Sequence, residues 1–410
     1  MSGKRSPLAP ARFPDMPAVA GVELGAKACG IRYRDRTDVC LVTLASGSTA
    51  AGVFTRSKTA SAPVEWCKQA VARGRARALV INSGNANAFT GRAGTGSVEQ
   101  VVAATRSLLD CRAREVFVAS TGVIGEPLPE QKLIGALGSL RQAQTPEAWQ
   151  AAAEAIMTTD TYPKGASRTA LIGEIKVTIN GIAKGSGMIA PDMATMLAFV
   201  FTDAKLPPPV LRDLLRRGAD RSFNAITVDG DTSTSDTLML FATGQARHPR
   251  VSDAKTSHLR GFRDALEDLL SDLAQQVVRD GEGAQKLVSI TVTGAASARA
   301  ARRIGLAIGN SPLVKTAIAG EDPNWGRIVM AVGKAGEKAD RDRLVIAIGG
   351  IEIAREGEVV SGYDETPVAR HMKGQEIDIA VDVGVGRGKA TVWTCDLTHG
   401  YIDINADYRS

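Results

Sequence analysis

The sequence predicts a mixed fold of the α/β or α+β class, because strand-like and helix-like segments alternate along its 410 residues. The chain is long enough to form two or three domains around a large core. Aromatic residues make up 4% of it and hydrophobic residues 44%, so Ala, Val, Leu and Ile must supply most of that core. No internal repeat or low-complexity linker is evident, and we place a candidate domain boundary near residues 283–290.

Buried strands and amphipathic helices are predicted in the first half, after an irregular, proline-rich arm over residues 1–20. The predicted strands are residues 38–45, 52–56, 76–84 and 115–122. The predicted helices are residues 97–109 and 147–160. Ser97 can cap the first helix, and Pro163 prevents the second from continuing. Residues 171–181 have the pattern of a hairpin with Asn180-Gly181 as its two-residue turn.

The second half continues the same alternation. A buried strand is predicted at residues 196–201, and a helix that begins with proline at residues 208–223. Apolar residues at helical spacing predict the longest helix, over residues 259–278, and Asp280-Gly281 ends it. Further strands are predicted at residues 286–293, 343–348 and 376–382.

Charge and cysteine content exclude several classes of protein. The net charge is +6, but the 50 basic and 44 acidic residues are interspersed, and the few aromatics offer no platform for stacking nucleic-acid bases. The five cysteines include no CxxC pair and the four histidines no HxxxH motif, so neither a metal site nor a disulfide framework is signalled. No apolar run is long enough to span a membrane, and the N-terminal stretch lacks the apolar region of a secretory signal. We therefore expect a cytoplasmic protein with reduced thiols.

One threonine is a candidate nucleophile. With four histidines and no G-x-S-x-G motif, a Ser–His–Asp triad has little support. A threonine that becomes the first residue of a chain can instead use its own α-amine, with a pKa of about 8, as general base. Thr195 fits this role, because Gly and Ser residues, Pro191 and the small Ala194 precede it and an apolar strand follows. Without further information, the pattern fits an ordinary residue at the start of a core strand better.

A series of motifs in fixed order resembles one known family. The segment around Thr195 contains KGSGMIAP, then Asp192, then MATML. The other motifs, in chain order, are INSGNANAFTG, STGVIG, MTTDTYPK, SFNAITVDGDTSTSDT, RDGEGAQKL, GNSPLVKTAIAGEDPNWGRI and INADYRS. Together they resemble the ornithine acetyltransferase family of arginine biosynthesis, also called the glutamate N-acetyltransferase family. The resemblance extends from about residue 20 to residue 410.

The resemblance implies a self-processing enzyme with an N-terminal-nucleophile type of fold, in which two sheets pack between helices beside a smaller C-terminal α/β subdomain. Cleavage between Ala194 and Thr195 would give an α chain, residues 1–194, and a β chain, residues 195–410. The β chain would complete the catalytic domain, form the second subdomain and return to the active site as a tail, with residues 195–285, 286–395 and 396–410 respectively. Two copies of each chain would assemble, without nucleic acid or membrane as a partner.

The implied activity is transfer of an acetyl group from N2-acetylornithine to glutamate. No metal or bound cofactor is implied, and acetyl-CoA stays open as a second donor. Thr195 would carry the acetyl group, and Thr121 and Gly122 would form the oxyanion hole. This agrees with a strand whose end can aim a hydroxyl and a backbone N–H at one oxygen. The implied substrate-binding positions are Thr161, Lys184, Thr195, Glu282, Asn405 and Ser410.

Two other functions stay open at the level of the sequence. A related N-terminal-nucleophile aminopeptidase or amidase would give the acyl group to water. Lys184 and Glu282, with Asn405 and Ser410 near the C-terminus, suit an amino-acid acceptor better. A non-enzymatic binding protein with the same fold would remain one uncut chain. Taken singly, each of these residues also has an ordinary structural explanation, such as a solvated surface charge.

Overall fold

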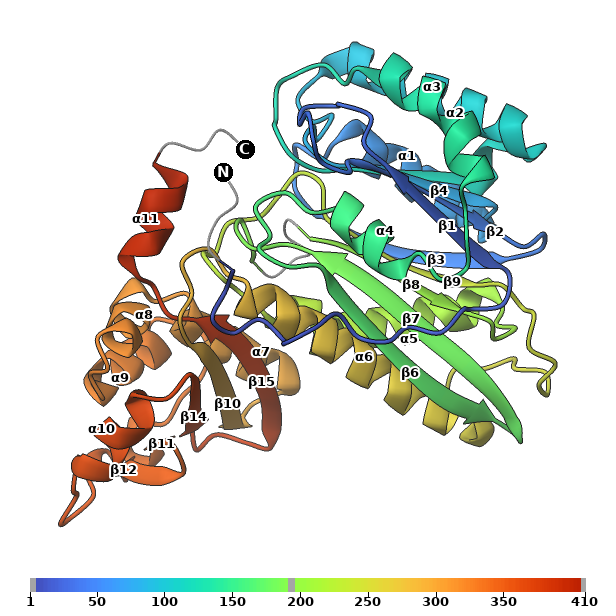
Figure 1. Ribbon diagram of the computed structural model, residues 1–410. Helices are drawn as coiled ribbons and strands as arrows, with labels where there is room; N and C mark the ends of the chain where they lie inside the picture. The colour runs from blue at the N-terminus through green and yellow to red at the C-terminus, as the bar shows by residue number, and fades with distance from the viewer. Residues whose placement is uncertain (1–4, 191–195, 407–410) are drawn as a thin grey trace.

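Two sheets lie face to face between layers of helices (Figure 1). The computed structural model describes residues 5–190 and 196–406. The first sheet has the order β1-β2-β4-β5 and consists of β1 (Val22–Lys27), β2 (Val39–Leu44), β4 (Ala78–Asn82) and β5 (Val116–Ser120). The second has the order β3-β9-β8-β7-β6 and consists of β3 (Thr49–Phe54), β6 (Lys164–Ile172), β7 (Ile175–Lys184), β8 (Leu197–Thr202) and β9 (Thr237–Ala242). The pairs β4–β5 and β8–β9 are parallel, and the other neighbours in these sheets are antiparallel.

Helices cover the outer face of each sheet (Figure 1). Those packed on the first sheet are α1 (Ala62–Ala70), α2 (Gly91–Leu109) and α3 (Glu130–Gln142). Those packed on the second sheet are α5 (Pro208–Arg221) and α6 (Arg260–Arg279). The short helix α4 (Trp149–Ala155) contacts β1 of the first sheet and β7 of the second.

Strand β8 illustrates how side-chain alternation divides the core. Phe199 and Phe201 point into the space between the two sheets, whereas Val200 packs on the side of α5 and α6. The ring of Phe201 stacks on Phe241 of β9 with centroids 5.3 Å apart, and Phe241 meets Phe117 of β5 edge to face at 5.8 Å. These aromatic rings therefore lie where the two sheets pack together.

The C-terminal part forms a separate α/β unit with its own core. Its sheet has the order β13-β12-β11-β14-β10-β15 and consists of β10 (Leu287–Ala295), β11 (Val345–Ile348), β12 (Ile351–Arg355), β13 (Glu358–Val359), β14 (Glu376–Asp382) and β15 (Gly388–Cys395). Its helices are α7 (Ala298–Gly309), α8 (Pro312–Ala319), α9 (Trp325–Gly333) and α10 (Thr366–Met372). A last helix, α11 (His399–Asn405), follows β15. Within the described part of the chain, no helix combines the length and apolar character needed to cross a bilayer.

The predicted fold class is confirmed: two sheets pack between helices, and a smaller α/β unit follows. The predicted turn at Asn180-Gly181 is wrong, because the hairpin turns at Gly173-Glu174 and both residues lie inside β7. The Asn180 amide donates to the Pro17 carbonyl at 2.6 Å. A Cβ on Gly181 would meet Leu273 of α6 at 2.7 Å, so this glycine allows a helix to approach the strand closely.

Two predicted helix boundaries are also wrong. Helix α2 begins at Gly91, and Ser97 lies inside it, with its hydroxyl bonded to the Ala93 carbonyl at 3.1 Å. Helix α4 ends at Ala155 instead of residue 160. The chain leaves the helix there because the Asp160 carboxylate accepts the Thr158 N–H at 2.9 Å in a local turn, which competes with the helical pattern.

Candidate active site

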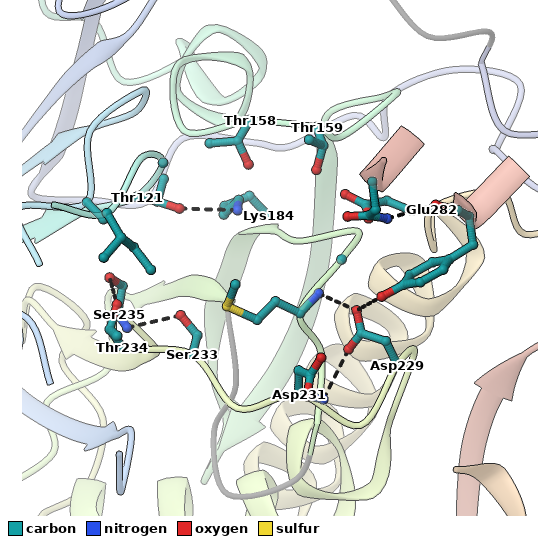
Figure 2. A pocket seen from close by; sticks show the side chains of 17 residues that line it. Thr121, Thr158, Thr159, Lys184, Asp229, Asp231, Ser233, Thr234, Ser235 and Glu282 are labelled. Atoms are coloured by element: carbon teal, nitrogen blue, oxygen red, sulfur yellow. Dashed lines mark hydrogen bonds between the residues drawn. The ribbon is translucent and has the colours of Figure 1, made fainter. Parts of the chain in front are cut away.

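A pocket opens where segments from both sheets meet helix α11 (Figure 2). Its walls come from the turn after β5, the loops after α4 and β7, the loop before β9, the turn after α6, and α11 itself. The polar side chains that line it are Thr121, Thr158, Thr159, Lys184, Asp229, Asp231, Ser233, Thr234, Ser235, Glu282, Tyr401 and Asn405.

Lys184 occupies the end of β7, in ladder register with Leu197 at the start of β8. Its side chain is 2% exposed, and Nζ donates a hydrogen bond to Thr121 Oγ1 at 3.2 Å (Figure 2). Burial lowers the pKa of the Lys184 ammonium, and the Asp160 carboxylate opposes that shift. A buried cation therefore lies beside the point where β8 begins.

The turn after β5 brings the Thr121 hydroxyl and the Gly122 backbone to the same pocket. Gly122 has φ +128, and a Cβ there would lie 2.4 Å from the Gly84 carbonyl carbon, so only glycine fits. Among the described residues, none accepts a hydrogen bond from the Gly122 N–H. A backbone N–H next to a hydroxyl is a donor pair that can stabilise an oxyanion.

Glu282 lies across the pocket from Lys184, in the turn after α6 (Figure 2). Its side chain is 8% exposed, and Oε2 accepts Asn405 Nδ2 at 2.7 Å. Burial raises the pKa of Glu282, and the hydrogen bonds from Asn405 and Thr159 oppose that shift. A Cβ on Gly187 would meet this carboxylate at 2.3 Å, so the glycine leaves the room that Glu282 occupies.

Asp229 fixes one wall of the pocket. Its carboxylate accepts the backbone N–H groups of Met188 at 2.6 Å and Ile189 at 2.9 Å, and the Tyr401 hydroxyl donates to it at 3.3 Å. The loop after β7 and helix α11 are thereby tied to one side chain. Helix α11 is also held by the Thr398 hydroxyl, which donates to the Gly283 carbonyl at 2.7 Å.

A fully buried network of ion pairs connects segments that carry pocket residues. Lys164 Nζ donates to Asp160 Oδ1 and to Asp280 Oδ2, each at 2.6 Å, and all three side chains are shielded from solvent. Asp160 also accepts the Gly185 N–H at 2.6 Å. Burial works against the charge on Asp160, but Lys164 and Lys184 outweigh it and hold the pKa of Asp160 well below its usual value.

This network joins three segments that carry pocket residues. Asp160 follows Thr158 and Thr159, Gly185 follows Lys184, and Asp280 precedes Glu282 by two residues. Thr161 belongs to the same network, because its backbone N–H and its hydroxyl both donate to the Asp280 carboxylate. The Thr161 side chain therefore packs behind the pocket, outside the residues that line it.

Asp236 is a fully buried carboxylate at the start of β9, next to the start of β8. Its Oδ1 accepts the Met196 N–H at 2.8 Å. The Thr55 hydroxyl, which donates to the Ser233 carbonyl at 2.8 Å, also lies close to this buried carboxylate. Burial raises the pKa of Asp236 well above its usual value, against the hydrogen bonds from Met196 and Thr55 and the Lys184 charge.

Five predicted site residues thus meet in one pocket: Thr121, Gly122, Lys184, Glu282 and Asn405. Thr161 does not line it. The remaining three, Ala194, Thr195 and Ser410, lie outside the described residues.

The fold brings further polar residues to the site that the sequence patterns did not single out. Thr158 and Thr159 belong to the motif MTTDTYPK, and Asp229 and Asp236 belong to the polar run DGDTSTSDT. Motifs so rich in Thr, Ser and Asp were the available signal, but they do not indicate which of their side chains face the pocket. Tyr401 was overlooked because only Asn405 and Ser410 were assigned to the site from the tail of residues 396–410.

Comparison with known proteins identifies relatives over nearly the whole length. The model of the ArgJ family matches residues 23–410. The arginine biosynthesis bifunctional protein ArgJ of Gluconobacter oxydans is 61% identical over 99% of this chain and 95% of its own. The protein of the same name from Mesorhizobium japonicum is 58% identical over the full length of both chains.

Solved structures are also similar. A crystal structure of the arginine biosynthesis bifunctional protein ArgJ from Bacillus halodurans is 38% identical, with a TM-score of 0.48, over 50% of this chain and 96% of that one. The ornithine acetyltransferase of Mycobacterium tuberculosis, solved with ornithine, is 35% identical, with a TM-score of 0.37, over 44% of this chain and 94% of that one. Because the family match and the full-length relatives cover almost every residue, the chain belongs to the ArgJ family.

Proposed function

We propose that this ArgJ-family chain transfers an acetyl group from N2-acetylornithine to glutamate, with Thr195 as the acetyl carrier. The observation that carries the proposal is the hydrogen bond between Lys184 and Thr121 at the end of the sheet where β8 begins. Thr195 is two residues before β8 in the sequence, and Leu197, the first residue of β8, pairs with Lys184 in the sheet. The names of the relatives, arginine biosynthesis bifunctional proteins, support the pathway.

The chain first cuts itself between Ala194 and Thr195. The Thr195 hydroxyl attacks the Ala194 carbonyl carbon, the peptide C–N bond breaks, and water hydrolyses the ester that results. The products are a carboxylate at Ala194 and a free α-amine at Thr195. That amine becomes the general base of the second reaction, since no histidine lines the pocket.

Acetyl transfer then follows in two halves. The Thr195 hydroxyl gives its proton to the α-amine while its oxygen attacks the acetyl carbonyl of N2-acetylornithine. The C–N bond breaks, and ornithine leaves with the proton from the new ammonium. In the second half the glutamate amine attacks the acetyl ester and regenerates the hydroxyl.

Both halves pass through a tetrahedral oxyanion, for which Thr121 and Gly122 are the proposed donors. Lys184 donates to the Thr121 oxygen, which leaves the hydroxyl proton of Thr121 free to bind the oxyanion. A neighbouring cation also polarises that hydroxyl and makes it a stronger donor.

The charges around the pocket suit both substrates. N2-acetylornithine has an α-carboxylate and a side-chain ammonium, whereas glutamate has carboxylates at both ends and an amine. Lys184 is a cation for a carboxylate, and Glu282 is an anion for an ammonium. The neighbouring hydroxyls of Thr158 and Thr159 are neutral and accept either type of group.

The same proposal covers assembly and location. The cut protein is an α₂β₂ heterotetramer of residues 1–194 and 195–410, and it works in the cytoplasm without a metal or bound cofactor. Residues 195–285 complete the catalytic domain, residues 286–395 form the second subdomain, and residues 396–410 return to the active site. Thr161 and Ser410 remain proposed substrate-binding positions, Thr161 acting through Asp280.

One assay tests the activity and separates it from its alternative. N-acetylglutamate formation is measured with N2-acetylornithine as donor, with acetyl-CoA as donor, and without glutamate. The proposal expects fast transfer from N2-acetylornithine and slow release of acetate without glutamate. If acetate is released rapidly and added glutamate does not reduce that release, the protein is an amidase. The acetyl-CoA arm decides whether a second donor is used.

A further inference from the structure

The proposed reaction does not use the motif INSGNANAFTG, although this segment lies directly against the proposed oxyanion hole. The motif begins in β4, and the loop that follows approaches the turn after β5. A Cβ on Gly122 would lie 2.4 Å from the Gly84 carbonyl carbon and 2.7 Å from the backbone nitrogen of Asn85. The loop therefore determines where the Gly122 backbone can lie.

Backbone hydrogen bonds hold the turn after β5 on both sides of Gly122. On one side, the Thr121 N–H donates to the Asn82 carbonyl at 3.1 Å. On the other side, the Ala86 N–H donates to the Val123 carbonyl at 2.9 Å. The positions of the two proposed oxyanion donors thus depend on where the end of β4 and the loop after it lie.

The side chain of Asn82 connects the three segments that meet here. It is 2% exposed, its Nδ2 donates to the Asn85 carbonyl at 2.9 Å, and its Oδ1 accepts the Ser120 hydroxyl at 2.7 Å. Asn82 and Ser120 are partners across the parallel pair β4–β5, and Ser120 directly precedes Thr121. One buried amide therefore fixes the end of β4, the loop after it and the end of β5 relative to one another.

We propose that Asn82 is a positioning residue for the oxyanion hole, an inference that rests on the proposed roles of Thr121 and Gly122. Its amide holds the loop against the turn, so that the Thr121 hydroxyl and the Gly122 N–H are in place before the oxyanion forms. Donors fixed in advance need no rearrangement during the reaction, and a displacement of about 1 Å can cost roughly 10²-fold in rate. Asn82 does not line the pocket, so it acts through the turn.

The test compares Asn82→Ala, which removes both side-chain hydrogen bonds, with Ser120→Ala, which removes only one of them. Asn180→Ala is the matched control, because Asn180 is also a buried amide inside a sheet and donates to the Pro17 carbonyl away from the pocket. The kcat and KM of N-acetylglutamate formation are measured per cut molecule, together with the unfolding temperature. Each substitution is made alone and in a chain that already carries Thr121→Ala.

We expect kcat to fall about 10²-fold in Asn82→Ala and about 10-fold in Ser120→Ala. KM should change little, because the oxyanion exists only in the transition state and the intermediate. Asn180→Ala should lower the unfolding temperature and leave kcat unchanged. In the chain that carries Thr121→Ala, both decreases in kcat should be smaller, since one of the two donors to be positioned is already gone.

Equal decreases with and without Thr121→Ala would overturn the inference, as would an effect confined to KM or a similar fall in kcat for Asn180→Ala. If Asn82→Ala yields no folded, cut protein, Ser120→Ala decides by the same criteria. A different result marks failure of the underlying proposal: if Thr121→Ala alone leaves kcat unchanged, or the unmodified chain transfers no acetyl group, the proposed oxyanion hole or the proposed function is itself wrong.

Discussion

Lys184 Nζ donates to Thr121 Oγ1 at 3.2 Å, which links the end of a strand in the second sheet to a turn of the first. The contact joins residues 63 positions apart and buries a cation next to the proposed oxyanion hole. Because it crosses the interface between the sheets, the site forms only when both sheets have packed.

The Thr121 hydroxyl is expected to contribute to rate more than to binding. Thr121→Ala removes one of the two proposed oxyanion donors, so kcat should fall by about 10²–10³ while KM changes little. Thr121→Ser keeps the hydroxyl and should retain most of the activity. Steady-state kinetics of both variants measure this. An alanine variant with kcat close to that of the serine variant would remove Thr121 from the oxyanion hole.

Protonation of Glu282 should weaken binding of the acetyl donor at acidic pH, which gives the pH profile of KM an acid limb. Burial raises its pKa above the ordinary value of about 4.3, and only its ionised form attracts the ammonium of N2-acetylornithine. The KM for this donor should therefore rise as pH falls through that raised pKa. Glu282→Gln should show a higher KM at neutral pH and no such limb.

A matched control for this limb is Glu267→Gln, because Glu267 pairs with Arg217 and Arg221 away from the pocket. Its KM should keep the acid limb of the unmodified chain. Persistence of the limb in Glu282→Gln would assign it to another group.

Lys164 should be the most sensitive single charge for stability. Lys164→Met leaves Asp160 and Asp280 buried without their cation, which should cost about 3–5 kcal/mol of unfolding free energy. Urea unfolding of Lys164→Met and of Lys176→Met, an exposed lysine in β7, measures the difference. Adding Asp280→Asn to Lys164→Met should recover part of the loss, since it removes one of the unpaired charges.

The pH dependence of that loss follows from the two pKa shifts. The pKa of Asp160 is held below its usual value, so its contribution is present above about pH 4 and is lost as pH falls through the lower folded value. The neighbouring carboxylates outweigh burial and raise the pKa of Lys164, so its contribution is present below about pH 10 and is lost as pH rises through the higher folded value. The stability gap between the unmodified chain and Lys164→Met should be largest near pH 9 and should narrow as pH falls. Without the Lys164 cation, burial raises the pKa of the two carboxyl groups, and their protonation relieves the variant. A gap that widens as pH falls from 9 to 5 would contradict the network.

The sequence predicted the fold where a segment carried its own signal. The apolar stripe of α6 and the continuous apolar run of β8 identify buried elements without reference to partners. The turn at Asn180-Gly181 was mispredicted because long-range packing overrides local turn preference there: α6 lies against Gly181 and the Pro17 carbonyl binds Asn180.

The sequence predicted the site residues that belong to a recognisable motif. It missed the residues that come together only through contacts between distant segments. Lys184 and Glu282 could be carried over from motifs, but nothing local in the sequence connects Lys164 with Asp280, 116 residues away. Asp236 was likewise overlooked, because its neighbour Met196 becomes adjacent only through the parallel pairing of β8 with β9. The roles of such residues depend on strand order, which a single sequence does not provide.

The most direct measurement is the mass of the two fragments after the purified protein is mixed with N2-acetylornithine alone. One added acetyl group should appear on the fragment that begins at Thr195, and none on the fragment that ends at Ala194. Thr195→Ala should remain one chain and take up no acetyl group. An uncut, unacetylated natural chain that still makes N-acetylglutamate, or a Thr195→Ala chain that still cuts between residues 194 and 195, would contradict the role of Thr195.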